Sequence, residues 1–104
     1  MDIEYQEPWN ATGKYADNLV KELEREVTEG HLLFQVEVRA IAQRTDSDDV
    51  LFRLPDGRCA VVHLTWSGEP EGDSRWPDTR VFESWEAWSR TGMMVDHAEF
   101  IGNE

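Results

Sequence analysis

The side chains in this sequence best suited to chemistry are three histidines, one cysteine and a few carboxylates near them. His63 lies inside an apolar stretch. An imidazole titrates close enough to neutral pH to act as a general base at the mouth of a pocket. Asp48 or Asp49 would then orient the imidazole or serve as a nucleophilic carboxylate, and Trp66 would line the same pocket.

A structural interpretation of these residues is also open, and it is the one we favour. His63 would be a strand histidine bonded to a loop, and adjacent carboxylates at the start of a strand commonly accept hydrogen bonds in turns. Cys59, within RCAVV, is expected to be a small buried hydrophobe. No histidine has a partner at a metal-binding spacing, and the glycines form no phosphate loop, so we expect neither metal nor cofactor.

Tryptophans and acids gather between residues 63 and 88 and form a candidate binding surface. Tryptophan is a frequent anchor of protein interfaces and can also hold a cation over its ring. The surface would consist of Trp66, Glu69, Glu71, Asp73, Trp76 and Trp88. The other interpretation is that the tryptophans fill a small core under a long loop, since a loop of this length is either functional or anchored by its side chains.

The net charge of the chain limits the kinds of partner that it can bind. The formal net charge is −12, from 22 acidic and 10 basic residues. Nucleic acid and anionic membranes both attract basic surfaces, so we expect neither as a partner. A basic protein partner or a cationic ligand fits better. The same charge weighs against strong self-association, so we expect a monomer or a weak oligomer.

The length and the apolar pattern predict one soluble domain over residues 1–104. A single cysteine cannot form an intramolecular disulfide, and the first ten residues lack the basic and apolar regions of a signal peptide. No apolar run approaches the roughly 20 residues of a membrane span. These features together predict a cytoplasmic location.

The N-terminal part is expected to contain one amphipathic helix. Residues 1–12 read as an extended or loosely ordered lead, with Trp9 packing back on the body. From about residue 14 to residue 28 apolar side chains recur at helical spacing, between Thr12 as a candidate cap and Gly30 as a stop signal. His31 follows the end of this helix, where a cation interacts favourably with the negative end of the helix dipole, so we expect a structural role for it.

Beyond Gly30 the apolar spacing changes to two residues and predicts strands over 34–44, 50–54 and 58–66. A Pro-Asp-Gly turn joins the last two as a hairpin. A short strand over 79–82 and a helix from Ser84 follow, with Gly92 interrupting the helix and Asp96 capping its last turn. The fold class is therefore α+β: a small antiparallel sheet of three to four strands with an N-terminal and a C-terminal helix packed on one face.

One part of the chain resembles a group of small acidic bacterial proteins of unassigned function. The run SDDVLFRLPDGRCAVVHLTWSGEPE, followed by WPDTRVFESWEAW, carries the resemblance over about residues 45–90. In size and acidity this group is similar to immunity proteins, which neutralise bacterial toxins in the cytoplasm. The resemblance implies a binding role and carries over no catalytic residue.

We therefore predict an acidic interaction protein, immunity- or inhibitor-like, that binds a basic macromolecular partner. The absence of a catalytic motif favours binding over catalysis. The alternative is a small enzyme or small-ligand-binding domain centred on His63.

Overall fold

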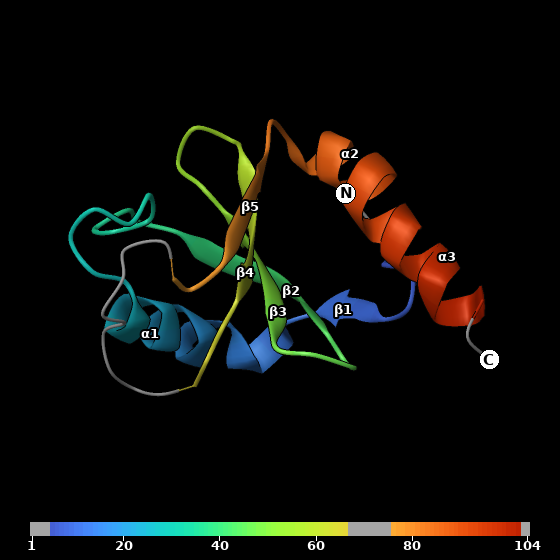
Figure 1. Ribbon diagram of the computed structural model, residues 1–104, viewed down its shortest axis with the longest axis horizontal. Helices are drawn as coiled ribbons and strands as arrows, with labels where there is room; N and C mark the ends of the chain where they lie inside the picture. Colours follow the sequence, from blue (N-terminus) through green and yellow to red (C-terminus); the bar gives the residue numbers. More distant parts are fainter. Residues whose placement is uncertain (1–4, 67–75, 103–104) are drawn as a thin grey trace.

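The computed structural model describes residues 5–66 and 76–102, and its centre is a five-stranded antiparallel sheet (Figure 1). Neighbouring strands follow chain order. They are β1 (Trp9–Ala11), β2 (Arg39–Arg44), β3 (Asp49–Arg53), β4 (Cys59–His63) and β5 (Thr79–Phe82). The α+β class and the antiparallel sheet are confirmed. The predicted count of three to four strands is too low, because the lead contributes β1, whose Trp9 is fully buried.

One helix precedes the sheet and a longer helical segment follows it. A 3₁₀ turn, η1 (Gly13–Tyr15), leads into α1 (Ala16–Glu26). After β5 come α2 (Trp85–Trp88), a π-helical turn η2 (Ser89–Met93) and α3 (Met94–Gly102). No helix in the described part of the chain is long and apolar enough to cross a membrane.

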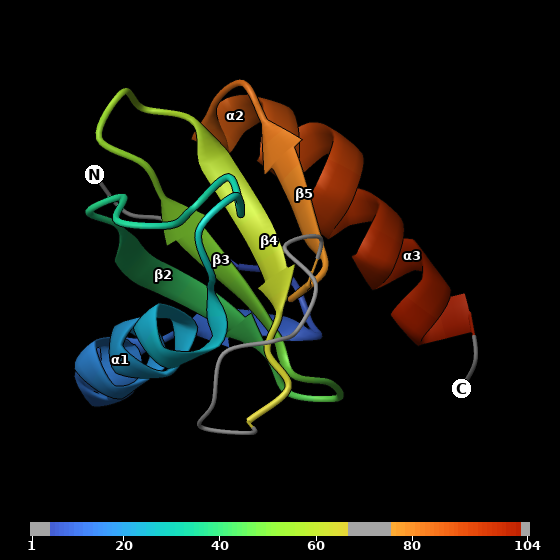
Figure 2. The same ribbon diagram turned by 60° about the vertical axis from the view of Figure 1, so that its left-hand side comes forward.

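The helices lie on opposite faces of the sheet, which corrects the prediction that both pack on one face (Figure 2). Successive residues of a strand point to opposite faces. Phe52 therefore packs in the core that contains Leu23 of α1, while Leu51 packs in the core that contains Trp88. Because β3 and β4 are apolar on both sides, both faces of the sheet need a cover.

The strand predicted over 34–44 begins only at Arg39, because the preceding residues form turns. The His31 side chain holds these turns. Its Nδ1 accepts the Leu33 N–H at 3.0 Å, so Nε2 carries the proton and donates to the Pro77 carbonyl, also at 3.0 Å. The structural role predicted for His31 thus takes the form of a buried link between the end of α1 and the segment before β5.

The predicted helix signals have mixed outcomes. Ser84 caps α2 by accepting the Ala87 N–H at 3.0 Å, as predicted. Thr12 does not cap α1, because its hydroxyl donates to the Ala40 carbonyl of β2 at 2.9 Å. At Gly92 the helix widens into the π-helical turn and then continues as α3, so Asp96 lies within a helix and caps none.

Candidate functional site

Polar side chains form a row across the strand ends on the face covered by the C-terminal helices. Strand register places Trp9 opposite Arg44 and Asp49 opposite His63. The next residue across is Asp78, whose carbonyl accepts the His63 N–H at 2.9 Å. The sheet therefore brings together residues that are up to 69 positions apart, and no local sequence signal predicts this row.

The His63 imidazole is held by a carboxylate, as the alternative hypothesis requires. Its Nδ1 lies 2.8 Å from Asp49 Oδ1. The His63 side chain is 52% exposed and that of Asp49 is 18% exposed. Of the two candidate carboxylates only Asp49 makes this contact; Asp48 takes part through its backbone carbonyl, which accepts the Leu64 N–H at 3.1 Å. The imidazole borders a cavity of about 260 Å³ that Val61, Asp78 and Arg80 also line.

Arg44 links this histidine to a second set of carboxylates. Its guanidinium binds Asp46 through two hydrogen bonds of 2.8 Å, which hold the pKa of the Asp46 carboxyl below its usual range. The same guanidinium lies 3.9 Å from Asp49 and 3.6 Å from Asp96. Asp96 is buried and accepts the Trp9 indole N–H at 2.9 Å. The row is therefore one charge-paired network with His63 at its exposed end.

A second polar group, on the other face of the sheet, was missed by sequence reasoning. Glu22 and Glu26 are both buried in α1, and Glu26 has no exposed surface. Its two carboxylate oxygens accept the N–H groups of Thr65 and Trp66, each at 2.8 Å. Burial raises the pKa of Glu26 to about 7, helped by a hydrogen bond to Glu22 and opposed by the two backbone N–H groups.

A sequence signal for this pair existed. Glu22 and Glu26 are four residues apart and share the helix face of Leu19 and Leu23, so both acids lie on the apolar stripe. The position of Glu26 also explains why the sheet pairing does not extend to Trp66: the N–H groups of Thr65 and Trp66 bind Glu26 and not a neighbouring strand.

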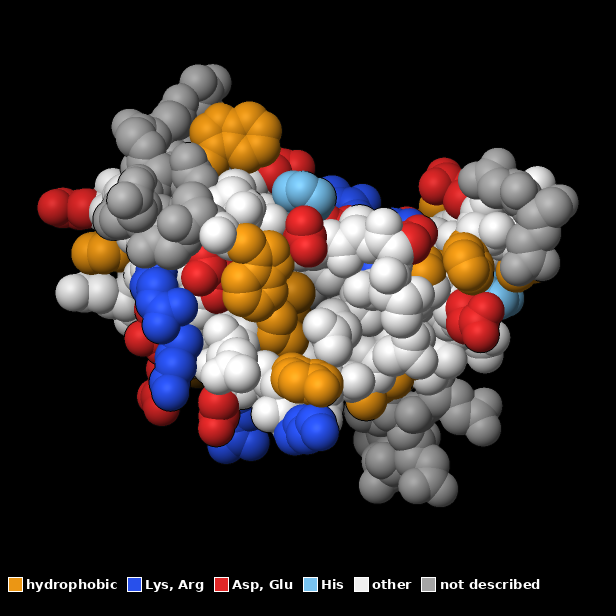
Figure 3. Space-filling model, turned by 90° about the horizontal axis from the view of Figure 1, so that it is seen from below, with side chains coloured by type: hydrophobic (Ala, Val, Ile, Leu, Met, Phe, Trp, Pro, Cys, Tyr) orange, Lys and Arg blue, Asp and Glu red, His pale blue; other side chains and the backbone are white. Residues whose placement is uncertain are grey.

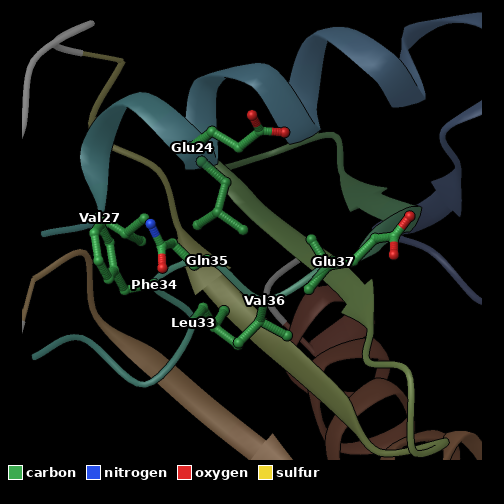
Figure 4. A pocket seen from close by; sticks show the side chains of 9 residues that line it. Glu24, Val27, Leu33, Phe34, Gln35, Val36 and Glu37 are labelled. Atoms are coloured by element: carbon green, nitrogen blue, oxygen red, sulfur yellow. The ribbon is translucent and has the colours of Figure 1, made fainter. Parts of the chain in front are cut away.

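A groove lies between α1 and the turns that follow it (Figure 4). Its volume is about 390 Å³. Apolar side chains form its floor and wall: Leu23, Val27, Leu33, Phe34, Val36 and Val38. Glu24 and Glu37 stand at its rim on different sides, one on α1 and one on the segment before β2. We call this the α1 groove.

The predicted tryptophan surface is only partly available for contact. Trp66 and Trp76 are each 49% exposed. Trp88 is fully buried and packs edge to face against Trp9, with ring centroids 5.2 Å apart, so its assignment as a contact residue is wrong. The predicted Glu69, Glu71 and Asp73 lie outside the described residues.

The burial of Cys59 and the grouping of possible metal-ligating side chains bear on two further predictions. Cys59 is fully buried, and burial raises the pKa of its thiol, so it behaves as the small hydrophobe that we predicted. Among residues 5–66 and 76–102, no three His, Cys, Asp or Glu side chains are grouped as metal ligands.

Comparisons of this chain with protein-family models, curated proteins and solved structures find no match. The function must therefore be argued from the geometry of its own sites.

Proposed function

We propose that this chain is a binding protein for a basic protein partner, and that the α1 groove receives an apolar side chain of that partner flanked by Lys or Arg. An immunity- or inhibitor-like role in the cytoplasm is one use of such a surface. The observation that carries the proposal is an open apolar groove with a carboxylate on each side, in a chain of net charge −12.

The groove provides the two contributions that an interface needs. Its apolar lining offers a pocket for a buried anchor, which is where most binding energy is concentrated. Glu24 and Glu37 are exposed and accelerate the approach of a positive partner, because rim charges act mainly on association. The two carboxylates come from different elements, so bases on both sides of an anchor would each meet an acid.

Exposed apolar side chains extend the same surface. Phe34 is 36% exposed and Leu32 is 53% exposed, on the turns that border the groove. The bond from His31 to the Pro77 carbonyl brings the neighbouring Trp76, one of the predicted anchors, to the same end of α1. Scattered exposed apolar residues are normal, but a group beside a pocket is typical of an interface.

A panel of defined peptides tests this proposal. Peptides with a central Leu or Phe flanked by lysines would be compared with copies whose lysines are replaced by glutamine. We expect saturable binding of the basic peptides, with backbone NMR shifts at residues 23–38. In the double variant Glu24→Lys, Glu37→Lys association should slow and lose most of its salt dependence.

The matched control is Glu83→Lys, Glu86→Lys, which changes the net charge equally at exposed positions on β5–α2. If that control weakens binding as much as the rim variant, the attraction is general and the groove is not the site. If no basic peptide shifts residues 23–38, the proposal is wrong.

The His63–Asp49 bond supports a second candidate function, a small-ligand or catalytic site. Asp49 would hold the imidazole through Nδ1–H, which leaves Nε2 to take or give a proton. Arg80 at the cavity would attract an anionic group of the ligand. We expect His63→Gln to abolish this function while the melting temperature stays nearly constant, because the side chain is half exposed. A large drop in melting temperature would instead mark His63 as structural.

A further inference from the structure

A separate cavity of about 350 Å³, which we call the Trp66 cavity, opens on the other side of α1. Its lining combines aromatic, cationic and amide side chains: Tyr15, Asn18, Leu19, Lys21, Arg25, Gln43 and Trp66. It shares none of these residues with the α1 groove. Its volume is at the lower end of the range for small-molecule sites, roughly 300–1,000 Å³.

The charge of this cavity is opposite to that of the whole chain. Lys21 and Arg25 are exposed and line it, and no described carboxylate is among its lining residues. Arg25 lies 3.4 Å from the buried Glu22, a contact that uses one guanidinium nitrogen. Burial and the hydrogen bond between Glu26 and Glu22 raise the pKa of Glu26 to about 7, so the acid pair below Arg25 carries less than its full charge near neutral pH. Figure 3 shows Lys and Arg side chains next to hydrophobic ones on the face that α1 forms.

Trp66 is presented at this cavity by a strained backbone. Its φ is 58°, in the left-handed region that bulky residues rarely adopt. The Glu26 carboxylate holds that conformation through the Trp66 N–H, while the indole remains half exposed. Backbone strain that the surrounding structure maintains is found mostly at active sites and ligand sites.

We propose that this cavity binds a small planar aromatic anion, with its ring stacked on Trp66 and its anionic group between Lys21 and Arg25. Tyr15, which is 52% exposed, offers a second aromatic surface. The amides of Asn18 and Gln43 supply donors and acceptors for the polar edge of the ring. A cationic ring is disfavoured, because both charged side chains in the lining are positive.

The test is an NMR titration of the full chain with three probes: salicylate, AMP and the cation benzamidine. Salicylate carries a carboxylate and AMP carries a phosphate, so comparing the two shows which anionic group the cavity prefers. We expect at least one of them to give saturable shifts at residues 15–25 and 65–66. Benzamidine, a planar ring with the opposite charge, should give none.

Variants assign the binding to named side chains. Trp66→Asn tolerates a positive φ and removes the ring, so it should weaken binding roughly tenfold or more without unfolding the chain. Trp66→Tyr should restore most of the affinity. Lys21→Gln should also weaken binding, whereas Arg90→Gln, the same charge change at an exposed position on η2, should not.

Three results would overturn the proposal. They are the absence of saturable shifts with both anions at about 5 mM, equal binding of benzamidine, and unchanged affinity in a folded Trp66→Asn protein. Because the rim variants Glu24→Lys and Glu37→Lys lie outside this cavity, a failure here is distinct from a failure of the proposed partner binding.

Discussion

On the face of the sheet covered by α1, Glu22 and Glu26 are buried side by side, whereas on the other face the buried Asp96 meets an arginine and an indole N–H. Burying a carboxylate is unfavourable unless it is protonated, paired or hydrogen-bonded. The α1 face uses a shared proton and two backbone N–H groups. The other face uses charge pairing through Arg44. The two faces should therefore respond differently to pH.

The apolar parts of the two cores differ as well. Around α1 the core is mostly Leu and Val, and both the α1 groove and the Trp66 cavity adjoin that helix. Opposite, Trp9, Trp88 and Trp85 pack ring against ring, with Tyr5 beside them. The core of the aromatic face is thus closed by packed rings, while the α1 face carries both the α1 groove and the Trp66 cavity.

The largest expected effect comes from removing the centre of the aromatic face. Trp88→Ala should lower the free energy of unfolding by about 3–5 kcal/mol, because it empties a fully buried site. The control Trp76→Ala, at a half-exposed position, should lower it by less than about 1 kcal/mol. Urea unfolding followed by circular dichroism measures both. A small effect of Trp88→Ala would mean that the two faces do not differ in this way.

The second effect is a pH dependence of the free energy of unfolding that arises on the α1 face. The pKa of Glu26 is raised from 4.5 to about 7, so between these values the folded chain binds a proton that the unfolded chain has lost. Stability from this group is full below 4.5, decreases as pH rises and is lost above about 7. One proton gives a slope of at most about 1.4 kcal/mol per pH unit.

Glu26→Gln should flatten this slope in urea unfolding between about pH 5 and 7. Glu24→Gln, an exposed position on the same helix, is the matched control and should leave it unchanged. If Glu26→Gln and wild type lose stability in parallel as pH rises, Glu26 does not carry a proton in the folded state.

Sequence patterns predicted what depends on neighbours along the chain. The Ser84 cap and the strand over 79–82 rest on local signals and are found at the expected residues. The hairpin of β3 and β4 was also predicted, from its Pro-Asp-Gly turn. By contrast, β1 is a three-residue strand whose partner β2 lies about 30 residues away, and its local pattern is too short to be recognised.

The sites depended on information that local patterns do not contain. The His63–Asp49 contact was one of two open pairings, and the register of β3 and β4 selects it. The prediction for Trp88 is wrong because the sequence pattern of an aromatic stripe on a helix is the same whether the core or a partner covers it. The number of helices and their order along the chain do not say which face each one covers; the apolar residues on both sides of β3 and β4 require a cover on each face.

A third effect tests the charge-paired side of the comparison. Asp96→Ala should lower the free energy of unfolding by about 1–3 kcal/mol, because it leaves the buried Trp9 N–H without an acceptor and removes a partner of Arg44. Asp96→Asn keeps an oxygen for the indole and should recover part of the loss. Both values come from urea unfolding. Equal effects of the two substitutions would show that the charge, and not the hydrogen bond, is what Asp96 contributes.

The smallest expected effect concerns how the two helical segments begin. Ser84 caps α2 with its side chain, whereas α1 has no side-chain cap and starts from the 3₁₀ turn η1. Ser84→Ala should therefore cost about 1 kcal/mol of unfolding free energy, and Ser84→Asp should be close to neutral, since Asp also caps.

At the start of α1 the corresponding residue, Thr12, bonds to β2 instead. Thr12→Ser keeps a hydroxyl for the Ala40 carbonyl and should be tolerated, whereas Thr12→Asp supplies a good cap residue but removes that donor. If Thr12→Asp is more stable than wild type in urea, capping governs the start of α1. If it is less stable, the hydrogen bond from Thr12 to β2 governs the start of α1. The two helical segments are then held at their beginnings by different interactions.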